Sequence, residues 1–185
     1  MTTVKLTAGV CGLLMLGAAM GLAGRSAQIA QAPGKVPYVS WIGAHSAIQE
    51  SRYARVRDQK EWDKLWLEHT GQAAPAAVGV PAGPEIDFGR CEVVACFRGK
   101  AKNSNGERVT AIDDLHDAVR IRFDSASYQT MSLQPGAEDR GVDCVPFGIW
   151  LIERTNKQII VEENVQGVIG APPVWREQKR FPAGR

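Results

Sequence analysis

Histidine and cysteine, which often carry metal or nucleophilic chemistry, are scarce in this sequence. Three histidines and four cysteines occur among 185 residues, and no G-x-S-x-G, H-E-x-x-H, Walker or Rossmann pattern is present. The serines Ser125 and Ser127 have no histidine near them in the sequence, which an activated nucleophile would require. These absences predict no catalytic, cofactor-binding or metal-binding residues. A triad assembled from distant loops stays open.

The chain also lacks an excess of charge of either sign. It has 22 Lys and Arg against 20 Asp and Glu, and removal of residues 1–23 would take away only Lys5 from this balance. Nucleic-acid-binding proteins normally show a basic excess or a basic stripe. We therefore expect no nucleic-acid partner. The roughly 160 residues that follow are enough for one domain with its own core.

Long apolar runs are absent except at the N-terminus. Lys5 precedes the uncharged run "LTAGVCGLLMLGAAMGLAG", which is typical of a secretory signal, and Gly21 with Ala23 predicts cleavage after residue 23. A bilayer needs about 20 apolar residues, so an uncleaved N-terminal anchor is the alternative. Both interpretations predict export to the periplasm, the envelope or the outside. Membrane contact is expected only through such an anchor.

The remaining chain divides into three parts by composition. Residues 24–37 are small, polar and proline-containing and predict a tether, residues 38–163 predict a single α+β domain, and residues 164–185 predict a C-terminal tail. In the tail, the sequence "PPVWREQKRF" places apolar residues on one side of a short helix. That segment could dock on its own domain or on a partner.

The strongest local signal is an amphipathic helix at about 58–70. Asp58 is the predicted N-cap, Glu61 occupies the capping-box position, and Gly71 lies where a C′ glycine ends helices. The spacing i, i+3, i+4 and i+7 gives one apolar face. Its members are Trp62, Leu65, Trp66 and His69.

Alternating or β-branched segments predict the strands. They lie at about 46–57, 91–98, 108–112, 118–124, 146–154 and 158–164. Residues 155–157 join the last two segments, which predicts a β-hairpin. One helix followed by several strands predicts an α+β fold with a largely antiparallel sheet packed against the helix.

Three cysteines, Cys91, Cys96 and Cys144, follow the signal segment. Along a strand, residues five apart point to opposite faces and lie about 16 Å apart, so Cys91 and Cys96 cannot bond each other. If 145–153 runs antiparallel beside 91–98, Cys144 comes nearer to Cys96. The sequence therefore predicts a Cys96–Cys144 disulfide in preference to Cys91–Cys144. Free cysteines buried in the core are the third alternative.

The densest acidic cluster is "DDLHD", which combines His116 with Asp113, Asp114 and Asp117. Carboxylates and imidazole are ordinary metal ligands, so a metal or catalytic loop is one interpretation. A short aspartate-rich stretch between two strands is more often a turn. We favour the turn and keep an envelope enzyme that uses this loop as an alternative.

Five tryptophans raise the question of a contact surface. Trp62 and Trp66 are predicted on the buried helix face, and Trp150 alternates within a strand and is predicted in the core. Trp41 and Trp175 lie in irregular segments, and Phe181 accompanies Trp175 in the tail. These three residues are the candidate contact surface, for a protein partner or, alternatively, for a saccharide.

Across about residues 50–163 the order of features resembles the PrcB C-terminal domain family, which is known from a lipoprotein subunit of a spirochaete protease complex. The stretches that carry the resemblance are "EWDKLW", "PEIDF", "VVACFRG", a Gly/Asn turn and "PFGIWLIER". The turn reads "NSNGERV", where members more often have a Gly-Gly-aromatic sequence. The resemblance implies an extracytoplasmic, non-catalytic interaction domain that binds or stabilises a partner protein of the cell envelope. It brings no catalytic residues.

Overall fold

The computed structural model describes residues 35–73, 82–131, 140–168 and 170–184. Within these residues the chain forms one helix, two four-stranded sheets and a two-stranded ribbon of β4 (Ala101–Lys102) and β7 (Asp143–Cys144). The predicted α+β class, a largely antiparallel sheet against one amphipathic helix, is confirmed. The predicted signal or anchor, and the predicted tether up to residue 34, lie outside the described residues.

The first sheet has the order β1-β8-β3-β2, and all its strand pairs are antiparallel. Its strands are β1 (Val39–Gly43), β8 (Phe147–Glu153), β3 (Cys91–Phe97) and β2 (Arg52–Val56). The expected antiparallel pairing of 145–153 with 91–98 is confirmed, and its register sets Cys96 opposite Gly148.

The second sheet has the order β10-β9-β6-β5. Its strands are β10 (Trp175–Phe181), β9 (Gln158–Asn164), β6 (Ala118–Ser127) and β5 (Ser104–Asp114). The central pair β6–β9 is parallel and the two outer pairs are antiparallel. The stretch "DDLHD" closes the β5–β6 hairpin, where the Leu115 amide donates to the Ala118 carbonyl at 2.8 Å, so the predicted turn is confirmed.

Helix α1 (Gln59–Thr70) begins and ends where its capping residues predict. The Asp58 carboxylate accepts a hydrogen bond from the Glu61 amide at 2.8 Å, which satisfies one of the free N–H groups of the first turn. Gly71 adopts a left-handed conformation with φ 72°, which glycine tolerates without strain. Trp62, Leu65 and His69 are buried and Trp66 is half-buried, so the predicted apolar face is confirmed.

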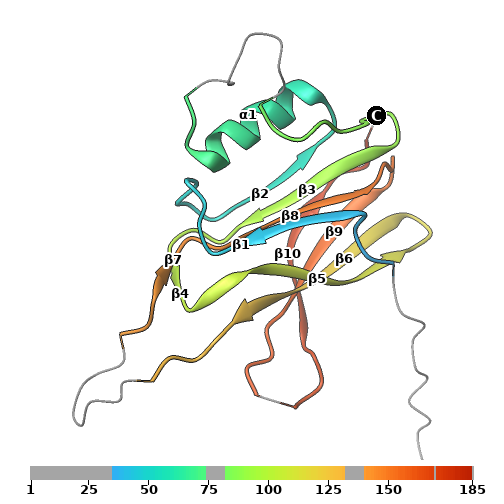
Figure 1. The fold of residues 1–185 in the computed structure, drawn as a ribbon. Helices are drawn as coiled ribbons and strands as arrows, with labels where there is room; N and C mark the ends of the chain where they lie inside the picture. The colour runs from blue at the N-terminus through green and yellow to red at the C-terminus, as the bar shows by residue number, and fades with distance from the viewer. Residues whose placement is uncertain (1–34, 74–81, 132–139, 169, 185) are drawn as a thin grey trace, which may run out of the picture. The chain divides into compact units, whose positions relative to one another are not determined.

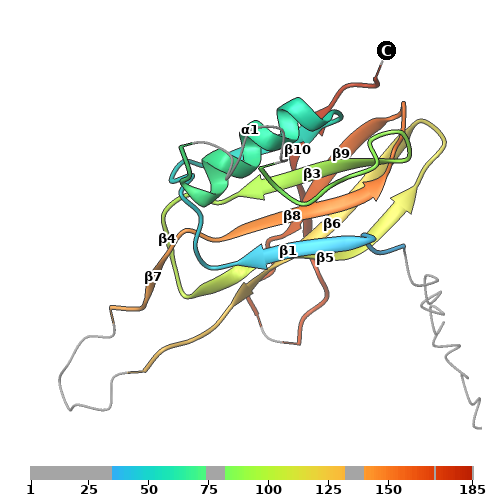
Figure 2. The ribbon, with the colours of Figure 1, turned by 45° about the horizontal axis from the view of Figure 1, so that its top comes forward.

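The helix and the two sheets are stacked on one another (Figures 1 and 2), and two apolar layers hold them together. Helix α1 packs on one face of the first sheet, where Trp62 and Leu65 meet Val93, Phe97 and Ile149. The other face of the first sheet packs on the second sheet, and this layer contains Val94, Trp150, Ile121, Phe123 and Val161. Because both faces of β3 are covered, its residues from Glu92 to Phe97 are all buried. The chain is therefore a β-sandwich with a helix on one side.

The predicted hairpin between 146–154 and 158–164 is wrong. Strand β8 pairs with β1 and β3, whereas β9 pairs with β6 and β10, so residues 154–157 carry the chain from one sheet to the other. A connection of three or four residues is compatible with both arrangements. Strand β8 is apolar on both faces and takes a central position, which leaves it no free edge for β9.

The predicted short helix in residues 164–185 is wrong, because a strand lies there instead. Residues 175–181 form β10, an edge strand that pairs with β9. The register shifts between Glu177 and Lys179, and such a β-bulge inserts one extra residue. Trp175 and Phe181 therefore lie on opposite faces of the sheet, although an even spacing normally places residues on one face.

The N-terminal boundary lies earlier than predicted. The backbone of Lys35 pairs with Ile112 through hydrogen bonds of 3.0 and 2.7 Å, and β1 begins four residues later in a region that the sequence left without a strand. Residues 32–185 form one compact unit. Over the described residues, no helix combines the length and hydropathy that crossing a bilayer requires.

Candidate functional site

The acidic residues of the predicted catalytic loop are dispersed in the structure. Asp113 forms an ion pair with Arg120 at 3.0 Å, and Asp114 accepts from Lys157 at 2.6 Å. The hydrogen bond from Lys157 lowers the pKa of Asp114 below its usual range. Asp117 contacts Gln158, and His116 is exposed. Because each carboxylate has its own partner, the loop brings no two groups together for acid–base work.

A metal centre has no donor set in the described part of the chain, where no group of three or more His, Cys, Asp or Glu side chains could hold an ion.

The predicted contact residues lie in three different environments. Trp41 packs beside α1, with its ring centroid 5.7 Å from that of Trp62. Trp175 lies on the outer face of the second sheet, where the Arg122 guanidinium is 5.2 Å from its ring centroid. Phe181 packs against the layer between the sheets. All three are half-buried, and because they lie beside α1, on the outer face of the second sheet and between the sheets, they do not form one continuous surface.

The predicted Cys96–Cys144 disulfide is not formed in the structure, where Cys91, Cys96 and Cys144 are free. Cys96 faces Gly148, and Cys144 precedes Gly148 by four residues, about 13 Å at the rise of an extended strand. A disulfide requires Cα atoms within about 7 Å. Cys91 faces Glu153 at the opposite end of β3 and is farther away still.

A serine–histidine contact is not predicted by the sequence. The Ser46 hydroxyl lies 3.0 Å from Nδ1 of His69, at the end of α1, and both side chains are buried. Burial lowers the pKa of His69. The same hydroxyl accepts from the Ile48 amide, and the Ala47 amide donates to the His69 carbonyl. These bonds tie residues 46–48 to the helix, so the pair has a structural role.

Two glutamates are fully buried, which the sequence does not predict. Glu92 on β3 accepts two hydrogen bonds from Arg55 at 3.0 and 3.1 Å and one from the Thr155 amide at 3.2 Å. Arg55 in turn donates to the carbonyls of Thr155, Lys157 and Pro182. This network joins β2, β3, the β8–β9 connection and the C-terminal segment.

Glu107 on β5 lies between the sheets and is less well satisfied. Its Oε1 accepts from Arg98 and from the Ser125 hydroxyl, both at 3.3 Å, whereas Oε2 is buried without a hydrogen-bond partner. Arg98 also pairs with Glu163, so one guanidinium serves two carboxylates. Burial raises the pKa of Glu107 and raises that of the neighbouring Cys96 to about 12.

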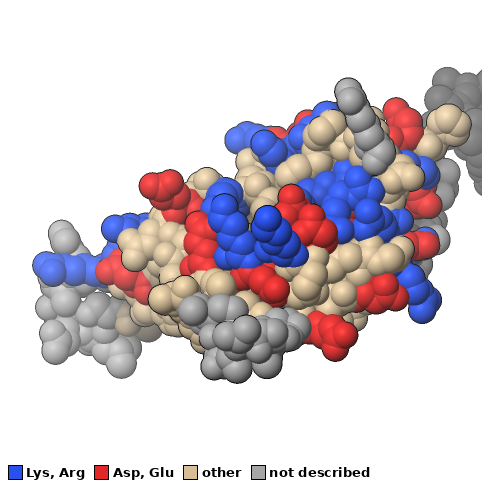
Figure 3. All heavy atoms as spheres, turned by 90° about the horizontal axis from the view of Figure 1, so that it is seen from above, with Lys and Arg blue, Asp and Glu red and all other residues tan. Residues whose placement is uncertain are grey.

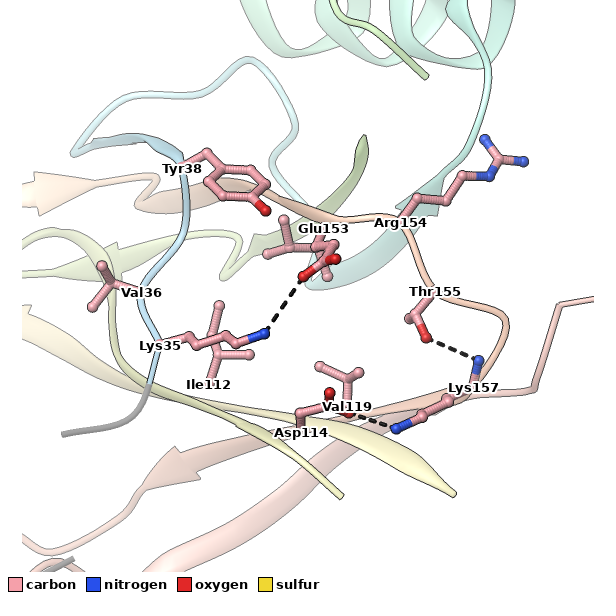
Figure 4. Close-up of a pocket in the computed structure, with 11 residues that line it drawn as sticks. Lys35, Val36, Tyr38, Ile112, Asp114, Val119, Glu153, Arg154, Thr155 and Lys157 are labelled. Atoms are coloured by element: carbon pink, nitrogen blue, oxygen red, sulfur yellow. Dashed lines mark hydrogen bonds and ion pairs between the residues drawn. The ribbon is translucent and has the colours of Figure 1, made fainter. Parts of the chain in front are cut away.

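A pocket of about 200 Å³ opens at the end of the sandwich where both sheets meet the N-terminal segment (Figure 4). Buried Ile112, Val119 and Ile152, one residue each from β5, β6 and β8, line its apolar interior. Beside the pocket, the backbone of Lys35, in the segment that leads into β1, pairs with that of Ile112 on β5. The pocket is therefore built on rigid elements.

The mouth of this pocket carries charges of both signs. Lys35 faces Glu153 at 3.5 Å on one side, and Lys157 faces Asp114 at 2.6 Å on the other (Figure 4). The Tyr38 hydroxyl points toward the mouth. Tyr38 and Glu153 also line a second, more open hollow of about 620 Å³ beside Cys91 and Arg90.

Residues 36–42, which we call the apolar segment, run from the pocket mouth into β1. Among the described residues, eight large hydrophobic side chains are exposed, and four of them lie in this segment: Val36 at 66%, Tyr38 at 64%, Val39 at 40% and Ile42 at 36%. Val39 and Ile42 are three residues apart in β1 and project to opposite sides of this strand, so the segment exposes apolar side chains on both sides of the strand. Exposed apolar side chains gathered in one part of a fold are typical of an interaction site. The sequence "KVPYVSWI" contains this signal, although the predicted tether covers its first three residues.

Charges of both signs alternate on the helix-side face of the molecule (Figure 3). A face of this kind has no large field of one sign, so long-range electrostatic steering of a highly charged partner has little support.

Comparison of the chain with family models, with curated proteins and with solved structures finds no match. The resemblance to the PrcB C-terminal domain family therefore stays a prediction.

Proposed function

We propose that this chain is an extracytoplasmic, non-catalytic interaction domain that binds or stabilises a partner protein of the cell envelope. The observation that carries the proposal is the exposed apolar segment beside the pocket, at one end of a rigid sandwich. In the acidic loop, Asp113 and Asp114 are engaged in ion pairs with Arg120 and Lys157, which supports a non-catalytic role for that loop. The apolar first 23 residues support an exported location.

The test is quantitative affinity capture from envelope extracts with matched variants. A Val39→Asp/Ile42→Asp double variant places charge on the apolar segment outside the pocket. A Val168→Asp/Val174→Asp double variant places the same charges on exposed residues, at 71% and 55%, near the β9–β10 connection. We expect the wild type and the second variant to capture the same envelope protein in similar amounts. The first variant should capture at least about tenfold less of it, because the core of an interface excludes charge.

Thermal unfolding of each variant separates lost binding from lost folding. Equal enrichment by all folded variants, or no specific enrichment, would count against the proposal. Glycan binding that disappears in Trp175→Ala or Trp41→Ala would favour the saccharide-binding alternative. An envelope activity that disappears in Asp114→Asn or His116→Ala would favour the enzyme alternative.

A further inference from the structure

The pocket at the end of the sandwich has the size of a side-chain site. Its volume of about 200 Å³ lies below the roughly 300–1,000 Å³ of ordinary small-molecule sites. Its interior is formed by the aliphatic side chains of Ile112, Val119 and Ile152. An occupant that fills it must therefore be one compact apolar group.

The mouth offers hydrogen-bonding groups of the kind that a peptide backbone complements. Lys35 and the Tyr38 hydroxyl can donate, and the Glu153 carboxylate can accept. The Lys35–Glu153 pair is 3.5 Å long and both side chains are about two-thirds exposed, at 67% and 66%. An exposed pair of this kind contributes little stability, so its members can reorient toward a ligand. The two signs at the mouth do not favour an occupant of high net charge.

The contact surface continues beyond the pocket. Val36 and Tyr38 line the pocket, and Val39 and Ile42 extend the exposed apolar segment along β1. A free small molecule in the pocket would leave that segment exposed. A polypeptide can fill the pocket with one side chain and cover the neighbouring segment with its flanking residues.

We propose that the pocket receives one large apolar side chain, such as phenylalanine or leucine, from an extended, uncharged segment of the partner protein. The backbone of that segment bonds Lys35, Tyr38 and Glu153 at the mouth. This inference rests on the proposed function and names the chemistry of its partner. In such interfaces a single buried anchor side chain carries much of the binding energy.

The experiment uses the full protein with isotope-labelled Ile and Val methyl groups, and it requires no knowledge of the partner. The probes are the capped peptides acetyl-Gly-Ser-Phe-Ser-Gly-amide, its Leu and Ala versions, and acetyl-phenylalaninamide. We expect the Phe or Leu peptide to shift the methyl signals of Ile112, Val119 and Ile152 and to bind at least about tenfold more tightly than the Ala peptide, the difference expected from burying such a side chain.

Two variants and one control locate the site. Val119→Phe fills the pocket and should abolish the methyl shifts of Ile112 and Ile152, and the wild-type shifts keep the test valid if this variant does not fold. Lys35→Ala removes a hydrogen-bond donor at the mouth. It should weaken the binding of the Phe peptide more than the binding of acetyl-phenylalaninamide. Lys179→Ala, an exposed lysine on β10, should change neither.

Several outcomes would overturn the inference. Methyl signals that do not move at millimolar peptide, or that move equally with the Ala peptide, would show that the pocket takes no anchor. Acetyl-phenylalaninamide binding as tightly as the Phe peptide would indicate a small-molecule site. If capture depends on Val39 and Ile42 while the pocket does not respond, this inference fails and the proposed function survives. If capture fails while the pocket binds the Phe peptide, the proposed function fails instead.

Discussion

Two buried glutamates show how the surroundings of a single residue decide its chemistry. Glu92 is bonded by Arg55 and the Thr155 amide, and Nε of Arg57 lies 3.4 Å away. Glu107 shares Arg98 with Glu163, and its Oε2 has no partner. A buried charge is stable only where its hydrogen bonds are complete. Burial raises the pKa of Glu107, so Glu107 is the buried carboxylate whose protonation we expect to affect stability.

The first prediction concerns the pH dependence of stability at Glu107. Because its folded pKa is raised, the unfolded state releases the proton first as pH rises above about 4.3, the ordinary value of a glutamate. The contribution of neutral Glu107 to the free energy of unfolding is fully present below that pH. It is lost as pH rises toward the folded pKa, by at most about 1.4 kcal/mol per pH unit. Glu107→Gln stays neutral and should lack this loss.

Urea denaturation of both proteins between pH 4 and pH 8 measures the effect. The unfolding free energy of the wild type minus that of Glu107→Gln should fall with rising pH. A difference that rises with pH would mean that Glu107 is ionised and held by Arg98.

The second prediction concerns the three thiols. Cys96 and Cys144 are 1% and 5% exposed, Cys91 is half-buried, and burial raises the pKa of Cys96 to about 12. Since the thiolate is the reactive form, we expect iodoacetamide to modify Cys91 first and Cys96 only after unfolding. Mass spectrometry of the denatured, unreduced domain should find three alkylated cysteines. A disulfide-linked peptide containing Cys144 would instead support the predicted disulfide.

At the scale of the element, the edge strands β1 and β10 are the two strands of the four-stranded sheets that the sequence did not predict. Strand β10 carries four charged residues and a bulge, devices that protect an exposed sheet edge from pairing with other chains. Strand β1 continues the apolar segment and has no such charges. This contrast is consistent with a partner that contacts the β1 end of the sandwich.

The third prediction tests whether β10 belongs to the domain. A chain that ends at residue 168 loses the packing of Phe181 and the 2.8 Å bond from Arg55 to the Pro182 carbonyl. We expect it to lose roughly 3 kcal/mol or more of unfolding free energy, from the lost aromatic packing and the charged hydrogen bond. Chemical denaturation measures this loss. A truncated chain as stable as the full domain would mean that residues 169–185 are a dispensable tail.

At the scale of the whole molecule, the first sheet is shared by both apolar layers. Trp62 of α1 packs on one of its faces, and Trp150 projects from its other face toward the second sheet. Neither layer can open without exposing side chains of β3 and β8. The helix and the sandwich should therefore behave as one folding unit.

The fourth prediction follows from this sharing. Unfolding of residues 32–185 in urea should give one transition, with the same midpoint by tryptophan fluorescence, to which the helix-side cluster Trp41, Trp62 and Trp66 contributes, and by far-ultraviolet circular dichroism. Val168→Asp, on an exposed residue, should leave the midpoint nearly unchanged. A fluorescence change that precedes the loss of strand signal would show that the helix layer opens separately.

Local signals in the sequence determined the helix and the position of most strands. Asp58, Glu61 and Gly71 act within one or two turns of α1, so no distant residue was needed to predict it. The continuous apolar run within 91–98 likewise reflects burial on both faces of β3, and the alternation of 118–124 reflects burial on one face of β6. The prediction that Asp113–Asp117 form a turn also came from local composition alone.

Only the tertiary structure decided which strands are neighbours and which side chains meet. The sequence of residues 155–157 fits a hairpin turn as well as a connection between two sheets. In β10 the bulge shifts the side-chain alternation by one residue, so a search for a fixed period of two does not detect the strand. The Arg98–Glu163 ion pair joins residues 65 positions apart, and the pocket between Lys35 and Lys157 joins residues 122 positions apart. Such contacts depend on the packing of two sheets, a property of the assembled fold that no local window of sequence contains.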